Sequence, residues 1–376
     1  MRGEQTQSAT DNLRIVAIAA GLTAAVLFIV VALSYRLEEY ADGLMFSYSV
    51  AVRDAWAFHW HNISGRAFVY LWCFVPAEAY VALARDPAGG ILLYGFLFYS
   101  APLAGLALTF AADRSRGRIV FSYACASTAC VCPLVFGFPT EMWMAHALFW
   151  PTLAAAHYAR RNAASFIVIT ALMAALVHTH GGAVLYAIAI LCTLLLRGHR
   201  DPTFIRGVVA FGLAVIVWAI VKEALPPGNY FGSILMAAAL NFIDVGDLAG
   251  RFMGLLGAAL ASYLLLCWAL DRRMPTYGCV VAAVLVAAGL AIYWTWFDQG
   301  LLADRRYAMR TALLILAPVL GAFAASFAVR DEDKLRLPLP LLPWLLQRLG
   351  SPAAARIATG FIAIVVLIHT VEANKF

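Results

Sequence analysis

Acidic and imidazole side chains gather in the segment that follows the first long apolar run. Asp42 stands between apolar and aromatic neighbours in RLEEYADGLMF, and His59, His61 and Arg66 follow in AFHWHNISGRAF. A carboxylate that its neighbours partly shield from water becomes more basic, which suits the removal of a proton from an acceptor hydroxyl. The alternative is an interfacial loop whose charged groups reach water. We predict Asp42 as a catalytic residue and the other three as substrate-binding residues.

Two further polar groups interrupt the middle of the chain. Glu141 follows a proline-containing turn in FGFPTEMW, and His178 and His180 lie in VHTHGG. A glutamate at the start of a helix also interacts favourably with the helix dipole. An H-x-H pair without a third ligand fits a hydrogen-bonded turn better than a metal site. We predict Glu141 as catalytic and both histidines as substrate-binding; no metal ligand is assigned, and a divalent metal cofactor is left open.

Basic side chains follow later apolar runs. Lys222 lies in VKEALPP, and Arg305, Arg306 and Arg310 lie in LLADRRYAMR. Planar guanidinium groups bind phosphate through paired hydrogen bonds, whereas ion pairs with the neighbouring aspartates are the alternative. We predict these four residues as substrate-binding. The sequence contains no glycine-rich phosphate loop of the nucleotide-binding kind.

The composition defines the elements that must position these residues. Of 376 residues, 63% are hydrophobic and 13% charged, with a mean hydropathy of +0.82; soluble domains carry about 25% charged residues. The sequence therefore predicts an all-α polytopic transmembrane bundle of about 11–12 spans, because each span needs about 20 residues. Residues 1–376 form one integral membrane domain. The apolar runs lie near 13–35, 91–111, 119–138, 142–158, 163–178, 182–196, 204–221, 252–270, 277–297, 307–328 and 356–371, with 67–84 ambiguous.

Arginine-rich connections indicate the topology. They occur in every second loop, at 112–118, 158–162, 196–206, 270–273 and 329–348. Such loops face the cytoplasm in inner-membrane proteins, and we therefore read the basic residues as a topology signal and not as a nucleic-acid site. This orientation makes 36–90 an outer-face loop with interfacial helices and 329–355 a cytoplasmic interfacial segment. It requires that 67–84 does not cross; if that run crosses, the N-terminus lies outside and Asp42 on the cytoplasmic face.

The cysteines and the N-terminal segment are also consistent with a membrane protein. The cysteines lie almost entirely inside apolar runs and are predicted to pack as small apolar side chains. The N-terminus lacks the features of a cleavable signal, so the first span is predicted to stay as an anchor. The expected location is the cell inner membrane, with the site facing the periplasm or exterior.

This architecture resembles the glycosyltransferase C superfamily, and the run from Asp42 through NISGRAF is similar to the acidic and Gly-Arg arrangement of some bacterial members. The resemblance implies transfer of a sugar, with inversion, from a polyprenyl-phosphate donor to an envelope lipid or glycan acceptor. It implies that Asp42 is the general base and that the three late arginines hold the donor phosphate. The chain departs from the family pattern in lacking a large C-terminal soluble domain and a paired-acid motif.

Other functions fit parts of the same pattern. A lipid-linked glycan ligase or polymerase would depend on outer arginine and histidine side chains. A lipid or sugar transporter or flippase would have charged residues in the middle of its spans and a twofold repeat. A structural membrane subunit would need neither mid-span charges nor a repeat. The expected partners are the lipid-linked donor, the lipid or glycan acceptor and membrane lipids. A shared outward cavity lined by Asp42, Glu141, His178 and Arg305 would favour the transferase.

Overall fold

The computed structural model consists of helices and connecting turns, without strands in the parts that it describes. Those parts are residues 2–40, 42–56, 63–115, 117–135, 140–158, 160–225, 248–271, 274, 278–293, 296 and 306–329. The chain divides into two compact units: unit 1 holds Met1–Gly228 and Gly321–Pro340, and unit 2 holds Asn229–Leu320 and Leu341–Phe376. The predicted all-α class is confirmed.

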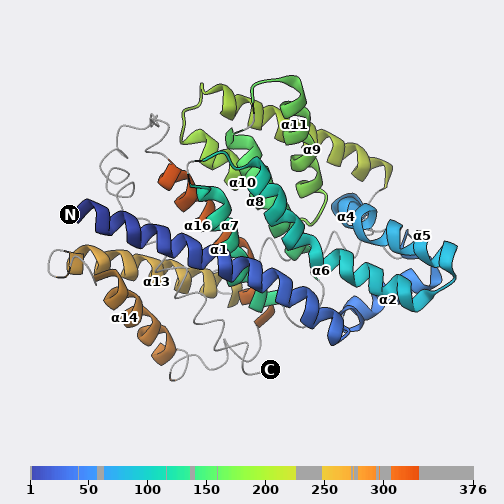
Figure 1. Ribbon diagram of the computed structural model, residues 1–376, viewed down its shortest axis with the longest axis horizontal. Coiled ribbons are helices and arrows are strands. Elements are labelled where there is room, and N and C mark those ends of the chain that lie inside the picture. The colour runs from blue at the N-terminus through green and yellow to red at the C-terminus, as the bar shows by residue number, and fades with distance from the viewer. Residues whose placement is uncertain are drawn as a thin grey trace. The chain divides into compact units, whose positions relative to one another are not determined.

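The helices coincide with most of the predicted apolar runs (Figure 1). In unit 1 they are α1 (Arg2–Ser34), η1 (Leu37–Glu39), α2 (Asp42–Val52), α4 (Ile63–Val69), η3 (Tyr70–Phe74), α5 (Val75–Ala84), α6 (Pro87–Ala112), α7 (Ile119–Val135), α8 (Glu141–Tyr158), α9 (Ala163–Val177), α10 (Ala183–Leu195) and α11 (Pro202–Ala224). Unit 2 contains α13 (Leu248–Asp271) and α14 (Gly278–Ile292), which pack on each other. The helix α16 (Arg306–Val329) belongs to unit 2 up to Leu320 and to unit 1 from Gly321.

Helix α8 lies at the centre of unit 1. Every residue from Glu141 to Ala156 is buried, although this stretch contains polar and charged side chains. Its neighbour α6 approaches so closely at Gly105 that an added Cβ would lie 2.2 Å from the carbonyl oxygen of Ala147. A similar approach joins α1 and α7, where a Cβ on Gly21 would lie 2.3 Å from the carbonyl oxygen of Cys125. Small residues at helix crossings are typical of bundles packed in a membrane.

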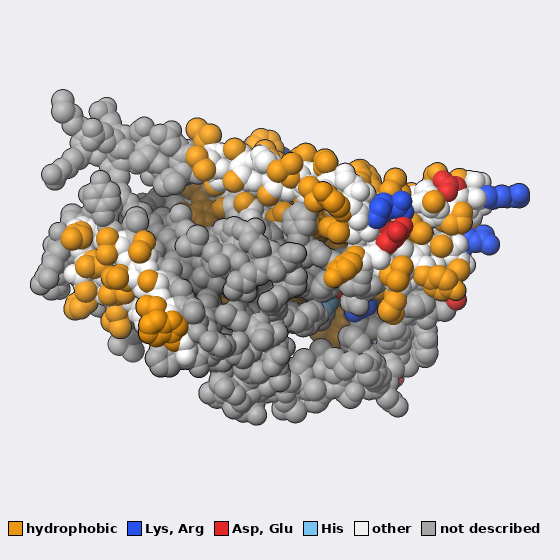
Figure 2. Space-filling model, turned by 90° about the horizontal axis from the view of Figure 1, so that it is seen from below, with side chains coloured by type: hydrophobic (Ala, Val, Ile, Leu, Met, Phe, Trp, Pro, Cys, Tyr) orange, Lys and Arg blue, Asp and Glu red, His pale blue; other side chains and the backbone are white. Residues whose placement is uncertain are grey.

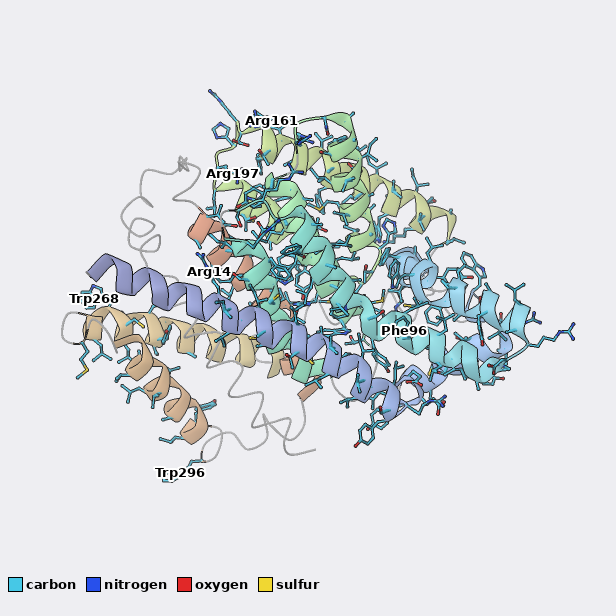
Figure 3. All side chains as sticks on the ribbon, viewed as in Figure 1. Arg14, Phe96, Arg161, Arg197, Trp268 and Trp296 are labelled. Atoms are coloured by element: carbon cyan, nitrogen blue, oxygen red, sulfur yellow. The ribbon has the colours of Figure 1, made fainter. Side chains whose placement is uncertain are left out.

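Turns rich in arginine lie at one end of unit 1, which we term the basic end. The guanidinium of Arg14, on α1, lies beside Gly117 in the α6–α7 turn. Two side chains join the α8–α9 and α10–α11 turns, because Arg197 donates to the carbonyl of His157 at 3.3 Å and Arg206 to that of Arg160 at 3.2 Å. Figure 3 shows Arg14, Arg161 and Arg197 on one side of this unit and Phe96 on the opposite side.

The opposite end carries α2, the continuous helix from Ile63 to Ala84, and the first turns of α6, which together we term the projection. Helix α6 continues past the end of α1, since Glu38, just after α1, packs on Gly95. Val50 of α2 and Val81 of α5 both pack on Gly90, nearer the start of α6. Charged side chains gather on this end in Figure 2, and hydrophobic ones cover much of the rest of the described face.

Four described helices are long and apolar enough to cross a membrane: Arg14–Ser34, Arg66–Ala84, Pro87–Ala112 and Pro202–Ala224. Shorter apolar helices include α9 and α10, which correspond to the predicted runs 163–178 and 182–196. The ambiguous run at 67–84 is thus helical and of spanning length. Within it, the Glu78 carboxylate accepts a hydrogen bond of 2.7 Å from the amide of Ala55. Whether this helix crosses stays a prediction, as does the total number of spans.

Candidate functional site

The centre of the candidate site is an ion pair between two helices that are distant in sequence. Arg66, on α4, places its guanidinium 3.1 Å from the carboxylate of Glu141, the first residue of α8. The side chains are 22% and 10% exposed, respectively, so both charges are largely removed from water. The Arg66 Nε atom is buried and has no hydrogen-bond partner among the described residues. This guanidinium therefore keeps a donor free for a further acceptor.

The turn between α9 and α10 lies against both partners. The amide of Phe68, on α4, donates to the carbonyl of His178 at 3.1 Å. An added Cβ on Gly182 would lie 3.2 Å from the sulfur of Met142, next to Glu141 on α8. The VHTHGG turn is thereby held beside the ion pair, and any side chain at position 182 would push these groups apart.

The two histidines of this turn carry their protons on different nitrogens. His178 Nδ1 lies 2.8 Å from the carbonyl oxygen of Ala174, which only accepts, so Nδ1 holds the hydrogen. His180 Nδ1 accepts from the amide of Gly182 at 3.0 Å, so the neutral ring holds its hydrogen on Nε2. The buried Nε2 of His178 has no partner among the described residues. The turn therefore presents one imidazole acceptor and one imidazole N–H donor.

The ion pair acts electrostatically on His180. Burial lowers the pKa of this imidazole below its ordinary value, the Glu141 carboxylate opposes that change, and the Arg66 guanidinium adds to it. His180 is consequently neutral at pH 7, as its Nδ1 acceptor role requires. A neutral imidazole beside a guanidinium donates a hydrogen bond to an anion without itself requiring a counter-ion.

Of the predicted site residues, the structure brings together Arg66, Glu141, His178 and His180. The predicted base Asp42 begins α2, but its side chain lies outside the described residues, as do His59, His61 and Arg305. Arg306 and Arg310 lie on α16, and the structure does not describe their side chains. Lys222 lies in the last turn of α11, with its ammonium 4.9 Å from the ring centre of Trp218. The shared cavity with Asp42 and Arg305 therefore stays a prediction.

Glu38 is a buried carboxylate that follows the first span and was not among the predicted site residues. It is fully buried; its Oε1 accepts from Arg36 Nε at 2.7 Å, whereas Oε2 has no partner among the described residues. Burial raises the pKa of this carboxyl above its ordinary value. Asp113, equally buried, differs because it accepts hydrogen bonds on both oxygens from the α6–α7 turn and α7. Asp113 is thus explained by the fold, and the free oxygen of Glu38 is not.

Other polar atoms without partners among the described residues lie in the core formed by α6 and α8. The hydroxyls of Tyr94 and Tyr99 on α6, and the ring N–H groups of Trp143 and His146 on α8, are buried without partners among the described residues. Trp150 Nε1 and Ser127 Oγ contact His146 Nε2 at 3.4 and 2.9 Å, which leaves the hydrogen on Nδ1. Each unpartnered buried polar group costs about 1–3 kcal/mol. Bound water or a polar ligand would remove that cost.

No group of three metal-ligating side chains is present in the described part of the chain. Comparison with protein-family models, with curated proteins and with solved structures gave no match. The class of this protein therefore rests on its own fold and composition. It is an all-α membrane protein with a polar site buried at one end of the central helix of unit 1.

Proposed function

We propose that this protein is a membrane transferase that moves a sugar from a polyprenyl-phosphate donor to an envelope lipid or glycan acceptor. The observation that carries the proposal is the site formed by Arg66, Glu141, His178 and His180. Transfer from a lipid phosphate needs donors that stabilise charge on the leaving phosphate and a base for the acceptor hydroxyl. This site combines both kinds of group beside an apolar bundle.

Each side chain has a distinct role in the proposed reaction. The acceptor oxygen bonds to the anomeric carbon, the bond from that carbon to the phosphate oxygen breaks, and polyprenyl phosphate leaves. Arg66 and the Nε2 hydrogen of His180 bind the phosphate, while Glu141 orients Arg66. The acceptor's proton passes to a base, for which geometry favours the free Nε2 of His178 and the superfamily resemblance implies Asp42.

Charge distribution supports an outward-facing site. The arginine-rich turns gather at the basic end of unit 1, and the positive-inside tendency assigns such turns to the cytoplasm. The ion pair belongs to the opposite end, from which the projection extends. The helix from Arg14 to Ser34 is already long enough to cross the hydrocarbon core. Because the projection lies beyond the end of this helix, we infer that it occupies the outer interface and that the helix at 67–84 does not cross the membrane.

Binding of a polyprenyl phosphate tests this proposal directly. Undecaprenyl phosphate would be added to the protein in phosphatidylcholine nanodiscs, and bound lipid would be counted by native mass spectrometry. We expect Arg66→Gln to weaken binding about 10- to 100-fold, the effect of losing a hydrogen bond to a charged group. The matched control is Arg85→Gln, which removes an exposed arginine of the projection with no partner among the described residues. Its binding should equal that of the parent protein.

A transfer assay tests the chemistry itself. A polyprenyl phosphate that carries a labelled hexose would be incubated with the protein and an envelope-lipid extract, and label would be followed into the extract. Transfer that Arg66→Gln abolishes and Arg85→Gln preserves would support the proposal. If undecaprenyl phosphate bound no better than phosphatidylcholine, or if both variants bound equally, the site would not be a phosphate site.

A further inference from the structure

The basic end of unit 1 carries a concentrated positive surface that the proposed reaction does not use. The α8–α9 turn contributes Arg160 and Arg161, and the α10–α11 turn contributes Arg197 and Arg200, with Arg206 one turn into α11. Asp201 is the sole acidic residue in the described parts of these two turns, and its carboxylate accepts from the amide of Thr203 at 2.7 Å. The surface is therefore strongly positive.

The fold brings the two turns together through side-chain hydrogen bonds. Arg206 donates to the carbonyls of Arg160 and Asn162, and Arg197 donates to the carbonyl of His157. These contacts cross from the second turn to the first and fix their separation. The guanidinium group stays charged in these hydrogen bonds, because the pKa of arginine lies far above neutral pH.

Three guanidinium groups of this surface have no partner in the part of the chain that the structure describes. Arg160, Arg161 and Arg200 are exposed, and none forms an ion pair or side-chain hydrogen bond among the described residues. Figure 3 shows Arg161 and Arg197 on the same side of the unit. These groups are available to an anion that approaches from the membrane surface.

Apolar side chains border this surface on the two helices that begin there. Ile167 and Val168 on α9 and Ile205, Val208 and Val209 on α11 are exposed, and the two helices pack on each other. Both helices start at the basic turns, and the apolar residues lie within about two turns of those starts. Acyl chains fit along these side chains when a headgroup sits at the arginines.

We propose that this surface binds an anionic phospholipid, with its phosphate at Arg160, Arg161 and Arg200 and its chains along the starts of α9 and α11. Clusters of four to eight basic residues beside a membrane span bind anionic headgroups, with about a fivefold gain in affinity for each basic residue. The inference does not depend on the proposed transferase function, since no residue is shared with the ion-pair site.

Lipid binding to charge-matched variants tests this inference. The full-length protein in detergent would be titrated with phosphatidylglycerol and, separately, with phosphatidylcholine of the same chains, and bound lipid counted by native mass spectrometry. The test variant is Arg160→Gln/Arg161→Gln. The control is Arg53→Gln/Arg85→Gln, which removes two exposed arginines from the projection, also without partners among the described residues.

We expect the parent protein to bind phosphatidylglycerol more tightly than phosphatidylcholine. The test variant should lose about 30-fold in affinity for phosphatidylglycerol, and the control less than about threefold. A test variant that keeps its melting temperature and its phosphatidylglycerol affinity would overturn the inference, as would equal losses in both variants. If the test variant unfolds, Arg160→Lys/Arg161→Lys replaces it: this variant keeps the charge, and loss of more than about 30-fold there would also contradict binding by positive charge.

Discussion

The ion pair between Arg66 and Glu141 should stabilise unit 1 by an amount that a double-mutant cycle can measure. The variants are Arg66→Gln, Glu141→Gln and the double substitution. At 3.1 Å, the attraction in a surrounding of dielectric about 20 is about 5 kcal/mol before desolvation is subtracted. Exposed ion pairs contribute less than about 1 kcal/mol to the free energy of unfolding, and removal of one partner of a buried pair lowers that free energy by about 3–5 kcal/mol. With side chains 22% and 10% exposed, we expect a coupling energy of about 2 kcal/mol.

The two single variants should differ in a defined direction. Arg66→Gln removes a cation from the more buried of the two charges, that of Glu141, and should cost about 2–3 kcal/mol. Glu141→Gln leaves an arginine whose side chain still reaches water, and should cost less. Reversible unfolding in a mixed-micelle denaturant series, followed by tryptophan fluorescence, would give each free energy of unfolding. Replacing Glu39, which pairs with Arg36 at an exposed position, by Gln is the control and should cost below about 0.5 kcal/mol.

The same variants separate stability from ligand binding. Glu141→Gln should lose stability and still bind undecaprenyl phosphate, because the guanidinium of Arg66 is retained. Arg66→Gln should lose both. A coupling energy below about 0.5 kcal/mol would place the pair among weak surface contacts and refute the reasoning from burial. Lipid binding that is lost in Glu141→Gln but kept in Arg66→Gln would contradict the assignment of the phosphate contact to Arg66.

Three further predictions concern single positions. Glu38→Gln should raise the melting temperature at pH 7, because the folded protein loses stability as pH rises through the raised pKa of the buried Glu38 carboxyl. The control Glu39→Gln, at an exposed site, should not raise the melting temperature, and equal shifts in the two variants would contradict this prediction. Gly105→Ala should destabilise through a Cβ 2.2 Å from the backbone of α8, whereas Gly212→Ala, which meets no atom within 4 Å, should stabilise by about 0.5–1 kcal/mol; thermal unfolding that reversed this order would refute the packing. Finally, the lowered pKa of His180 means that its contribution to stability is full above the ordinary value of 6.5 and falls as pH decreases below it. His180→Gln should therefore make the fall in melting temperature below pH 6.5 less steep without abolishing it, because other histidines are buried too, and an unchanged profile would exclude His180 as a contributor.

The helices could be predicted from the sequence because their apolar runs are long and their ends carry local signals. Asn162 caps α9 by accepting from the amide of Ser165 at 2.9 Å, and Asp201 and Pro202 begin α11. Such signals act within a few residues and are visible in the sequence. The arginine-rich turns were found for the same reason, since each is a short local cluster.

The composition of the site could be predicted only in part. Glu141, His178 and His180 were selected for their position at span ends, and Arg66 for its place in the first polar segment. Their meeting depends on α4 packing beside α8 and the α9–α10 turn, a long-range arrangement that residue types do not encode. The burial of Glu38 has the same origin, because it requires the close approach to Gly95 on α6.

The two ends of unit 1 use their polar groups differently, and this contrast is the strongest reason to place function at the projection end. At the basic end, the buried carboxylate of Asp113 has hydrogen-bond donors on both oxygens and Asp201 caps a helix. At the other end, one oxygen of Glu38 and the Nε2 of His178 are buried without partners among the described residues. Structural carboxylates in this fold therefore have hydrogen-bond donors, whereas that Glu38 oxygen and the His178 nitrogen have none in the described part of the chain. Each unpartnered atom lowers the stability of the fold by about 1–3 kcal/mol. That cost is removed when a ligand or water supplies the partners, and it therefore directs the search for substrate to the projection end of unit 1.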